Sequence, residues 1–224
     1  MSLWSNDWLG EGIGIGVGTR EIAVGPRASR WMRWRDTASA MAMATRTVAM
    51  PQEQYYTESG VFDALRAAFA AEPGEEPTPA TNAPSRNRRA HIVLDDFWAN
   101  HAILRGDFRT LRTREIDGFA RAHFVDTYDL DPEAIVVRVC VQRGGRAAFA
   151  CALPRTLIEG IFDVGAAVGV SVRALKLCLP EMVNRALGAH PRPTTMLIFA
   201  ADALLQAVLI DAGGWAGYDA QRLG

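Results

Sequence analysis

The stretch Phe149–Leu187 constrains the fold most, because strand and helix patterns follow one another there without a gap. An apolar run ending near Ala152 predicts a strand, and Pro154 then stands where a helix tolerates proline, in its first turn. Apolar residues recur at three- and four-residue intervals over Leu157–Val168, which predicts a helix with one buried face. Gly169 predicts the end of that helix.

A second strand and a second helix complete this stretch. Apolar and polar residues alternate over Val170–Leu177, as is typical of a strand, and Pro180 starts another helix. A strand, a helix and a strand with short connections form a right-handed crossover between parallel strands in nearly every case. We therefore predict an α/β fold in which one mixed sheet, with helix Arg155–Val168 packed on it, holds Ala134–Val141, Ala147–Ala152 and Val170–Leu177.

The composition limits the class of protein. With 224 residues, 49% of them hydrophobic and 22% charged, the chain can bury a sizeable core as one domain or two small ones. The formal net charge of -1 lacks the basic excess of a nucleic-acid binder, so we expect no nucleic-acid partner. The N-terminus lacks a basic start and an unbroken apolar segment, which argues against a secretion signal.

The cysteines point to a reducing compartment. Cys140, Cys151 and Cys178 lie in apolar strand or strand-end sequence without CxxC spacing. We expect three reduced core residues of a cytoplasmic protein.

Two apolar runs near the C-terminus, Met196–Ala200 and Leu204–Ile210, predict a hairpin. The alternative is a membrane helix, but the combined run is shorter than the roughly 20 residues that a span needs. It also contains Asp202 and Gln206, and a carboxylate is costly inside a bilayer. We therefore predict no direct membrane span.

A glycine-rich segment near the N-terminus predicts another hairpin. Ile13, Ile15 and Val17 alternate with glycine, and Gly18-Thr19 supplies the turn before the apolar pattern resumes. A dinucleotide-binding fingerprint would need a helix directly after the glycines. A strand follows here, so we predict no Rossmann site.

A change of composition suggests the domain organisation. Residues 73–89 are rich in Pro, Glu, Thr and Asn and have little to bury, which predicts a flexible linker. The linker would separate residues 1–72, an N-terminal hairpin and helix, from residues 90–224, an α/β sub-domain with the crossover and the C-terminal hairpin. Within this sub-domain the apolar spacing over Thr113–Tyr128 predicts a helix.

The segment Arg27–Arg35 gathers arginines around Trp31 and Trp34. Such a segment can be a basic and aromatic surface for nucleic acid. It can also be a solvated arginine edge whose tryptophans pack inward, which is the interpretation that we favour.

No cluster of reactive residues predicts catalysis. Asp95-Asp96 could be a metal or acid–base pair, but adjacent strand residues point to opposite faces, which favours an acidic turn. Cys151 has no activating base nearby in the sequence. The histidines, none of which has a His or Cys partner at ligand spacing, are His91, His101, His123 and His190. We therefore predict no catalytic residue and no metal ligand.

The run ALPRTLIEGIFDVGAAVGVSVRALKLCLPEMVNRAL, followed by a hairpin with the turn Asp211-Ala212-Gly213-Gly214, resembles the pilus assembly protein PilM and the cytoplasmic part of the type II secretion protein GspL. Both belong to the actin-like ATPase superfamily. The resemblance is one of element order and hydrophobic pattern, across roughly Ile13–Gly25 and His91–Asp219. It implies a ribonuclease H-like or actin-like mixed sheet with crossover helices, truncated after the second hairpin.

The same resemblance implies two degenerate phosphate sites. The superfamily places an Asp-x-Gly hairpin before and after the crossover, where the carboxylates hold magnesium and the glycines let backbone N–H groups approach phosphates. Here the first pattern falls on Gly14 and Gly16, so the carboxylate is absent. The second falls on Phe199 and Ala201, with an aromatic ring for the carboxylate and alanine for the glycine. The resemblance therefore implies no bound cofactor, no metal and no ATPase activity.

Two classes of function remain. A non-catalytic scaffold of a pilus or secretion-type assembly would dock a membrane-anchored protein partner through a groove or a sheet edge, as the resemblance implies. Such a scaffold would be cytoplasmic, or peripheral at the inner membrane. The alternative is an enzyme or small-molecule binding protein whose site is built from residues distant in sequence.

Overall fold

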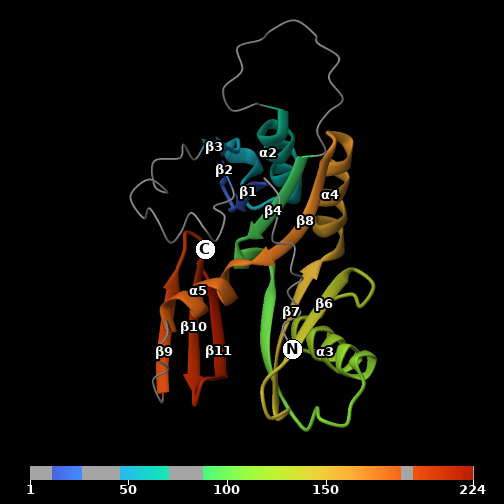
Figure 1. The fold of residues 1–224 in the computed structure, drawn as a ribbon, viewed down its shortest axis with the longest axis vertical. Coiled ribbons are helices and arrows are strands. Elements are labelled where there is room, and N and C mark those ends of the chain that lie inside the picture. The colour runs from blue at the N-terminus through green and yellow to red at the C-terminus, as the bar shows by residue number, and fades with distance from the viewer. Residues whose placement is uncertain (1–11, 27–45, 71–87, 188–193, 224) are drawn as a thin grey trace, which may run out of the picture. The chain divides into compact units, whose positions relative to one another are not determined.

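The computed structural model describes residues 12–26, 46–70, 88–187 and 194–223. The chain divides into two compact units, Met1–Leu94 with Gly160–Lys176 and Asp95–Glu159 with Leu177–Gly224 (Figure 1). It therefore passes from one unit to the other after Leu94, after Glu159 and after Lys176. Each unit is described by itself below.

The first unit is built on a five-stranded sheet in the order β3-β2-β1-β4-β8. Its strands are β1 (Ile13–Val17), β2 (Glu21–Pro26), β3 (Arg46–Ala49), β4 (Arg88–Leu94) and β8 (Val170–Leu177). β1 is antiparallel to β2 and parallel to β4. Figure 1 shows β4 and β8 running in the same direction, as the two ends of a crossover should.

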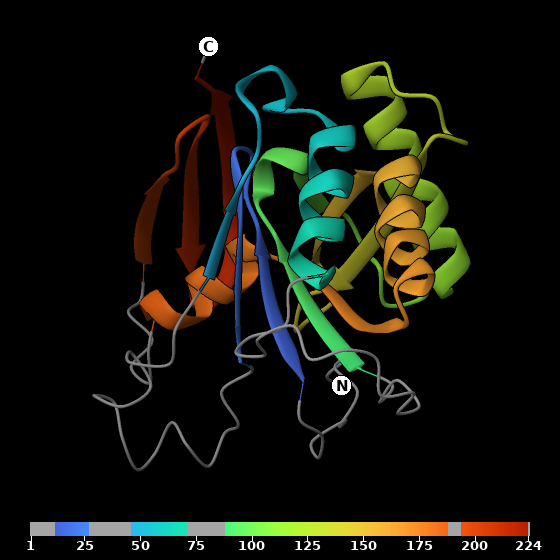
Figure 2. The same ribbon diagram turned by 90° about the horizontal axis from the view of Figure 1, so that it is seen from above.

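Two helices cover one face of this sheet, α2 (Glu58–Ala70) and α4 (Arg155–Ala167) (Figure 2). A Cβ atom on Gly160 of α4 would overlap the ring of Phe62 in α2, so the two helices lie side by side. A short 3-10 helix, η1 (Gln52–Gln54), precedes α2. Alternate strand residues are almost fully buried, as expected for one face of a sheet packed under helices; they are Ile15, Val17, Ile22, Ile92 and Leu94.

The second unit contains a three-stranded antiparallel sheet in the order β5-β7-β6. Its elements are η2 (Asp96–Trp98), β5 (Asn100–Arg105), α3 (Thr113–Tyr128), β6 (Ile135–Val141) and β7 (Ala147–Pro154). Ile116, Ala120 and Phe124 of α3 pack on small alanines of β7, Ala148 and Ala150 among them. The alanines let the helix approach the strand closely, and α3 has the bounds that the apolar spacing predicted.

A second three-stranded antiparallel sheet, in the order β11-β10-β9, lies in the same unit. Its elements are α5 (Cys178–Leu187), β9 (Thr194–Ala200), β10 (Leu204–Asp211) and β11 (Gly214–Arg222). Leu179 and Val183 of α5 bury against Val208 and Ile210 of β10. The predicted hairpin is confirmed, and no helix among the described residues is long and apolar enough to cross a membrane.

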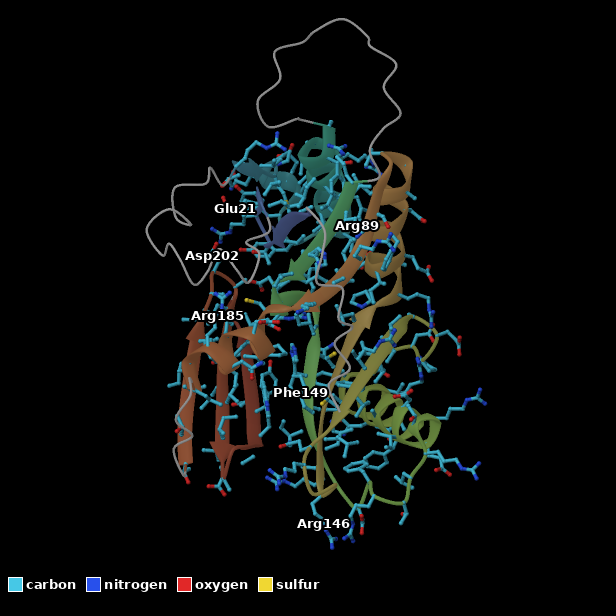
Figure 3. All side chains as sticks on the ribbon, in the orientation of Figure 1. Glu21, Arg89, Arg146, Phe149, Arg185 and Asp202 are labelled. Atoms are coloured by element: carbon cyan, nitrogen blue, oxygen red, sulfur yellow. The ribbon has the colours of Figure 1, made fainter. Side chains whose placement is uncertain are left out.

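Phe149 joins the two sheets of the second unit. Its ring lies 4.3 Å, centroid to centroid, from that of Trp215 in β11, and it packs on the cluster beneath α5 (Figure 3). Gln142 adds two hydrogen bonds to the same residue: its Nε2 donates to the Trp215 carbonyl at 2.9 Å, and its Oε1 accepts from the Trp215 N–H at 2.7 Å. These contacts fix β11 against the β5-β7-β6 sheet.

The predicted single sheet around the crossover is wrong. β7 is the central strand of its sheet, and both of its edges are already hydrogen-bonded, to β5 and to β6. It therefore has no free edge for β8, which pairs instead with β4 in the other unit. The crossover that contains α4 starts at β4, and the segment from Asp95 to the end of β7 is inserted into it.

The division into units also differs from the predicted boundary. β4 follows the predicted linker in sequence but lies inside the first unit's sheet, between β1 and β8. Arg88 and Arg89, assigned to the linker 73–89, are the first residues of β4. The rest of that linker lies outside the described residues, as do the segment 27–35 and its two tryptophans.

Several local predictions hold. β8 has the predicted bounds, and Gly169 ends the preceding helix with a φ of 69°. Gly18-Thr19 lies in the turn between β1 and β2. The cysteines are all free, but only Cys151 is buried, whereas Cys140 is exposed and Cys178 is half-buried. Cys140 is exposed because it lies in the part of edge strand β6 that extends past the core.

Candidate functional site

The hairpins β1–β2 and β9–β10 have the same geometry. Val17 pairs with Ile22 in the first, and Ala200 pairs with Leu205 in the second. In each turn the first residue donates its N–H to the carbonyl three residues later. These bonds are Gly18 N to Glu21 O, 3.0 Å, and Ala201 N to Leu204 O, 2.9 Å.

The third strand of each sheet continues the equivalence. Met50 N, just after β3, donates to Arg20 O at 2.8 Å, and Leu223 N, just after β11, donates to Ala203 O at 2.9 Å. The sheets β3-β2-β1 and β11-β10-β9 thus share strand order, direction and turn hydrogen bonds. The chain contains the same three-stranded motif twice, once in each unit.

The two motifs differ at their free edge. The edge of β1 that faces away from β2 is paired in parallel with β4 along its whole length. The same edge of β9 is paired with no strand of the part of the chain that the structure describes. β9 is seven residues long, TTMLIFA, and carries no charge, proline or glycine. Natural edge strands are usually blunted by such residues, and β9 has none of them.

The motifs differ on one face as well. Ile15 of β1 is 3% exposed, whereas its counterpart Ile198 in β9 is 65% exposed. Met196, on the same side of β9, is also 65% exposed, and Leu209, its neighbour on β10, is 37% exposed. We call Met196, Ile198, Ala200, Leu205, Ala207 and Leu209 the outer face of the sheet; α5 packs on the opposite, inner face. This outer face corresponds to the face that α2 and α4 cover in the first unit.

A buried polar cluster lies elsewhere in the second unit. The His101 and Asp96 side chains are each 2% exposed or less, and Nε2 lies 3.2 Å from Oδ1. The two atoms approach closely but are not aligned as a hydrogen bond. Tyr218 Oη lies 3.5 Å from His101 Nδ1 and accepts from Gln206 Nε2 at 3.1 Å. Burial raises the pKa of Tyr218 to about 12, so its hydroxyl stays protonated at neutral pH.

Sequence reasoning missed this cluster because its members come from η2, β5, β10 and β11, which are far apart in sequence. The 3-10 turn at Asp95 to Trp98 brings Asp96 back over His101, five residues later, and no periodic pattern signals such a turn. The expected acidic turn itself is present. Asp95 Oδ1 accepts from Phe97 N at 2.8 Å, and burial raises the pKa of the Asp95 carboxyl.

Neither a metal-binding cluster nor an activated buried thiol is present among the described residues. They contain no cluster of three or more His, Cys, Asp or Glu side chains placed to hold a metal ion. Burial raises the pKa of Cys151 to about 12 and that of Cys178 to about 11, which opposes thiolate formation. His123 lies against the ring of Phe124, and His190 falls outside the described residues.

Comparison with solved structures relates this geometry to a known fold. A Bacteroides thetaiotaomicron protein described as having an actin-like ATPase fold and unknown function matches 95% of this chain, with a TM-score of 0.57 and 6% sequence identity. The chain has the actin-like ATPase fold. No protein-family model and no curated protein matches the sequence.

Two further solved structures share the fold. The PilM chain of a PilM-PilN type IV pilus biogenesis complex matches 94% of this chain, with a TM-score of 0.60 and 11% identity. The cytoplasmic domain of EpsL, an inner-membrane component of the type II secretion system of Vibrio cholerae, matches 95%, with a TM-score of 0.51 and 11% identity. The chain spans 61% of the PilM chain, 71% of the EpsL domain and 70% of the Bacteroides protein, so it is shorter than each of them.

The predicted phosphate positions can be located in the two hairpins. Gly14 and Gly16 lie inside β1, two or more residues before the turn, whereas Phe199 and Ala201 lie at the end of β9 and in its turn. The equivalence of the hairpins pairs Phe199 with Gly16 and Ala201 with Gly18. On this register Gly16 and Gly18, rather than Gly14 and Gly16, are the counterparts of Phe199 and Ala201.

In both hairpins, side chains near the predicted phosphate positions already make contacts within the protein. Arg20, beside the first turn, donates from Nε and Nη2 to Tyr56 Oη at 3.0 and 2.7 Å. Its guanidinium also lies 5.7 Å from the ring centroids of Tyr55 and Tyr56. Phe199 turns to the inner face and packs on the cluster under α5.

Proposed function

We propose that this protein is a non-catalytic cytoplasmic scaffold of a pilus or secretion-type assembly, and that it docks a membrane-anchored protein partner. One observation carries the proposal: the equivalent positions Gly16 and Phe199 both lack the carboxylate with which the actin-like ATPase pattern holds magnesium. A magnesium-triphosphate carries several charges, and burying them without ligands costs several kcal/mol per charge. Arg20 can attract a phosphate but cannot serve as a magnesium ligand.

The solved neighbours support the assembly part of the proposal. EpsL is described as an inner-membrane secretion component, and PilM was solved in complex with PilN in pilus biogenesis. By analogy we place this chain in the cytoplasm, peripheral at the inner membrane through its partner. An exposed apolar sheet face on β9 and β10, and an edge of β9 that no described strand pairs with, are the kind of surface that protein partners use.

A second function, an enzyme or small-molecule binder with a site built from distant residues, has one observation in its favour. Asp96, His101 and Tyr218 form an acid–base constellation of the kind that enzymes use. The Asp96 and His101 side chains are almost fully buried, however, so a substrate could not reach them without local opening. We therefore assign the cluster a structural role.

Isothermal titration with magnesium-ATP tests the proposal. We expect no saturable heat at physiological nucleotide concentrations, with or without magnesium, and no phosphate release above that of buffer. Titration of the same ATP stock into an established ATP-binding protein controls for the ligand. Micromolar affinity or turnover would contradict the scaffold assignment.

Capture of the partner tests the assembly role. The full chain, immobilised and incubated with the detergent-solubilised membrane fraction of the native organism, should retain a membrane-anchored protein that mass spectrometry identifies as a component of a pilus or secretion system. Retention of cytosolic proteins alone would argue against the proposed role.

A further inference from the structure

Within the part of the chain that the structure describes, no strand pairs with the free edge of β9, and Met196 and Ile198 on the outer face beside it are each 65% exposed. In the first motif β4 pairs with this edge, and α2 and α4 cover the corresponding face. We propose that β9 binds an extended segment of a partner protein, parallel to itself, in which apolar residues alternate and basic residues flank the apolar part. The inference rests on the proposed scaffold function, and it specifies where the partner binds and what chemistry it has.

The pairing of β1 with β4 gives the direction and register. Ile13, Ile15 and Val17 of β1 lie opposite Ala90, Ile92 and Leu94 of β4, all on one face. The equivalent positions in β9 are Met196, Ile198 and Ala200. A partner strand in the same register would place its alternate apolar side chains beside these three residues and bury the two that are most exposed. The main-chain hydrogen bonds of a parallel ladder would supply the rest of the affinity.

The charges around the outer face select a basic segment. Asp211, at the end of β10, and Asp219, on β11 opposite Ala207, are exposed on the rim of this face. Arg222 is the only basic residue of the three strands, and it pairs with Leu204 on the inner side. An apolar face with an acidic rim favours a partner with Lys or Arg beside its apolar residues. The cytoplasmic flanks of membrane-anchored proteins are enriched in these residues.

A second copy of this chain fits the edge less well. Two copies of β9 related by a two-fold axis perpendicular to the sheet would pair antiparallel, because that axis reverses the strand direction. The template in the first unit is parallel.

A peptide with the sequence of β4, Arg-Arg-Ala-His-Ile-Val-Leu, is the probe for this edge, because β4 occupies the equivalent edge in the first unit and begins with two arginines. We would label the peptide at its N-terminus and measure its fluorescence anisotropy with the full chain. We expect saturable binding. Binding should be at least about tenfold weaker for Ile198→Lys and for Met196→Lys, which place a charge on the outer face. It should also be weaker for a peptide that begins with two glutamates.

Two controls separate binding from folding. Phe162→Lys adds the same charge at an exposed apolar site of α4, 44% exposed, and should leave peptide binding unchanged. A peptide of scrambled sequence should bind no better to the wild-type chain than to Ile198→Lys. Thermal unfolding of each variant should match that of the wild type, because Ile198, Met196 and Phe162 are all exposed side chains.

The inference would be overturned if the β4 peptide did not bind saturably, or if it bound equally to the wild type and to both outer-face variants. It would also be overturned if a photo-crosslinker at the peptide N-terminus labelled the Ala200 end of β9 rather than the Thr194 end. A wild-type dimer that Ile198→Lys converts to a monomer would assign the edge to a second copy. If Ile198→Lys still captures the membrane partner, the location on β9 is wrong while the scaffold function stands; nucleotide turnover would overturn the function itself.

Discussion

At the scale of single residues, two helical glycines differ in what surrounds them. A Cβ atom on Gly60, in the first turn of α2, would overlap the carbonyl oxygen of Gln54, which is backbone and cannot rotate away. A Cβ atom on Gly118, in α3, would meet nothing within 4 Å. We expect Gly60→Ala to lower the free energy of unfolding by about 1–3 kcal/mol, because the chain before α2 must shift.

The matched variant Gly118→Ala should raise the free energy of unfolding by up to about 1 kcal/mol, since alanine loses less backbone entropy in a helix. Urea denaturation followed by circular dichroism measures both changes. Equal effects from the two substitutions would show that the contact with Gln54 does not constrain the first turn of α2.

The three cysteines should react with a thiol reagent in the order of their exposure. Cys140 is exposed, Cys178 is half-buried and Cys151 is buried. Because burial raises the pKa of Cys178 to about 11 and that of Cys151 to about 12, little thiolate forms at either site at pH 8. We expect maleimide mass spectrometry to find Cys140 modified first and Cys151 last, with all three equal in guanidinium. Early modification of Cys151 would indicate that the β5-β7-β6 sheet opens readily.

At the scale of elements, Gln142 links the turn after β6 to the start of β11. Its amide makes two hydrogen bonds with the Trp215 backbone, and both partners are half-buried. We expect Gln142→Ala to lower the free energy of unfolding by about 1–3 kcal/mol, because the Trp215 N–H and carbonyl lose their partner where water reaches them poorly.

Gln221→Ala is the control for this substitution. Gln221 is exposed on β11, so its truncation should change stability by less than about 0.5 kcal/mol. Urea denaturation of the two variants gives the comparison. A Gln142→Ala variant as stable as Gln221→Ala would mean that the packing of Phe149 on Trp215 holds β11 in place without the amide.

The sequence predicted elements better than it predicted their pairing. The bounds of α3 and β8 follow from periods of 3.6 and 2, which are local properties of the chain. The partner of β8 depends on which strand edges remain free, and that is decided by the whole topology. β5 and β6 take both edges of β7, so β8 pairs with β4, a strand more than 75 residues earlier in the chain.

The exposed side of β9 could not be predicted from the sequence either. The apolar composition of β9 was visible in the sequence and was assigned to a hairpin, which is confirmed. That Met196 and Ile198 face outward could not be read from the sequence, because every residue from Met196 to Ala200 is apolar and no alternation marks the buried side. The register of β9 with β10 decides it, since Leu197 and Phe199 take the side that α5 covers.

At the scale of the whole molecule, the path of the chain predicts how the protein responds to a cut. The composition of residues 73–89 predicts that a protease cleaves there first under native conditions. Had this segment been a boundary between domains, the two products could separate. β4 begins within the last two residues of this segment, however, at Arg88, and lies between β1 and β8 in the first unit's sheet. The N-terminal product would therefore contain β1, β2, β3 and α2, while the C-terminal product supplies the other two strands of the same sheet.

We expect the nicked protein to stay assembled. Its two fragments should elute together from gel filtration at the volume of the intact chain, and they should separate only in denaturant. Separation would expose apolar side chains that are less than 5% exposed in the sheet, Ile15 and Val17 of β1 and Ile92 and Leu94 of β4. Gel filtration before and after limited proteolysis, with fragments assigned by mass spectrometry, makes the measurement. Fragments that separate under native conditions would show that the linker does divide two domains, and they would refute the placement of β4 in the first unit's sheet.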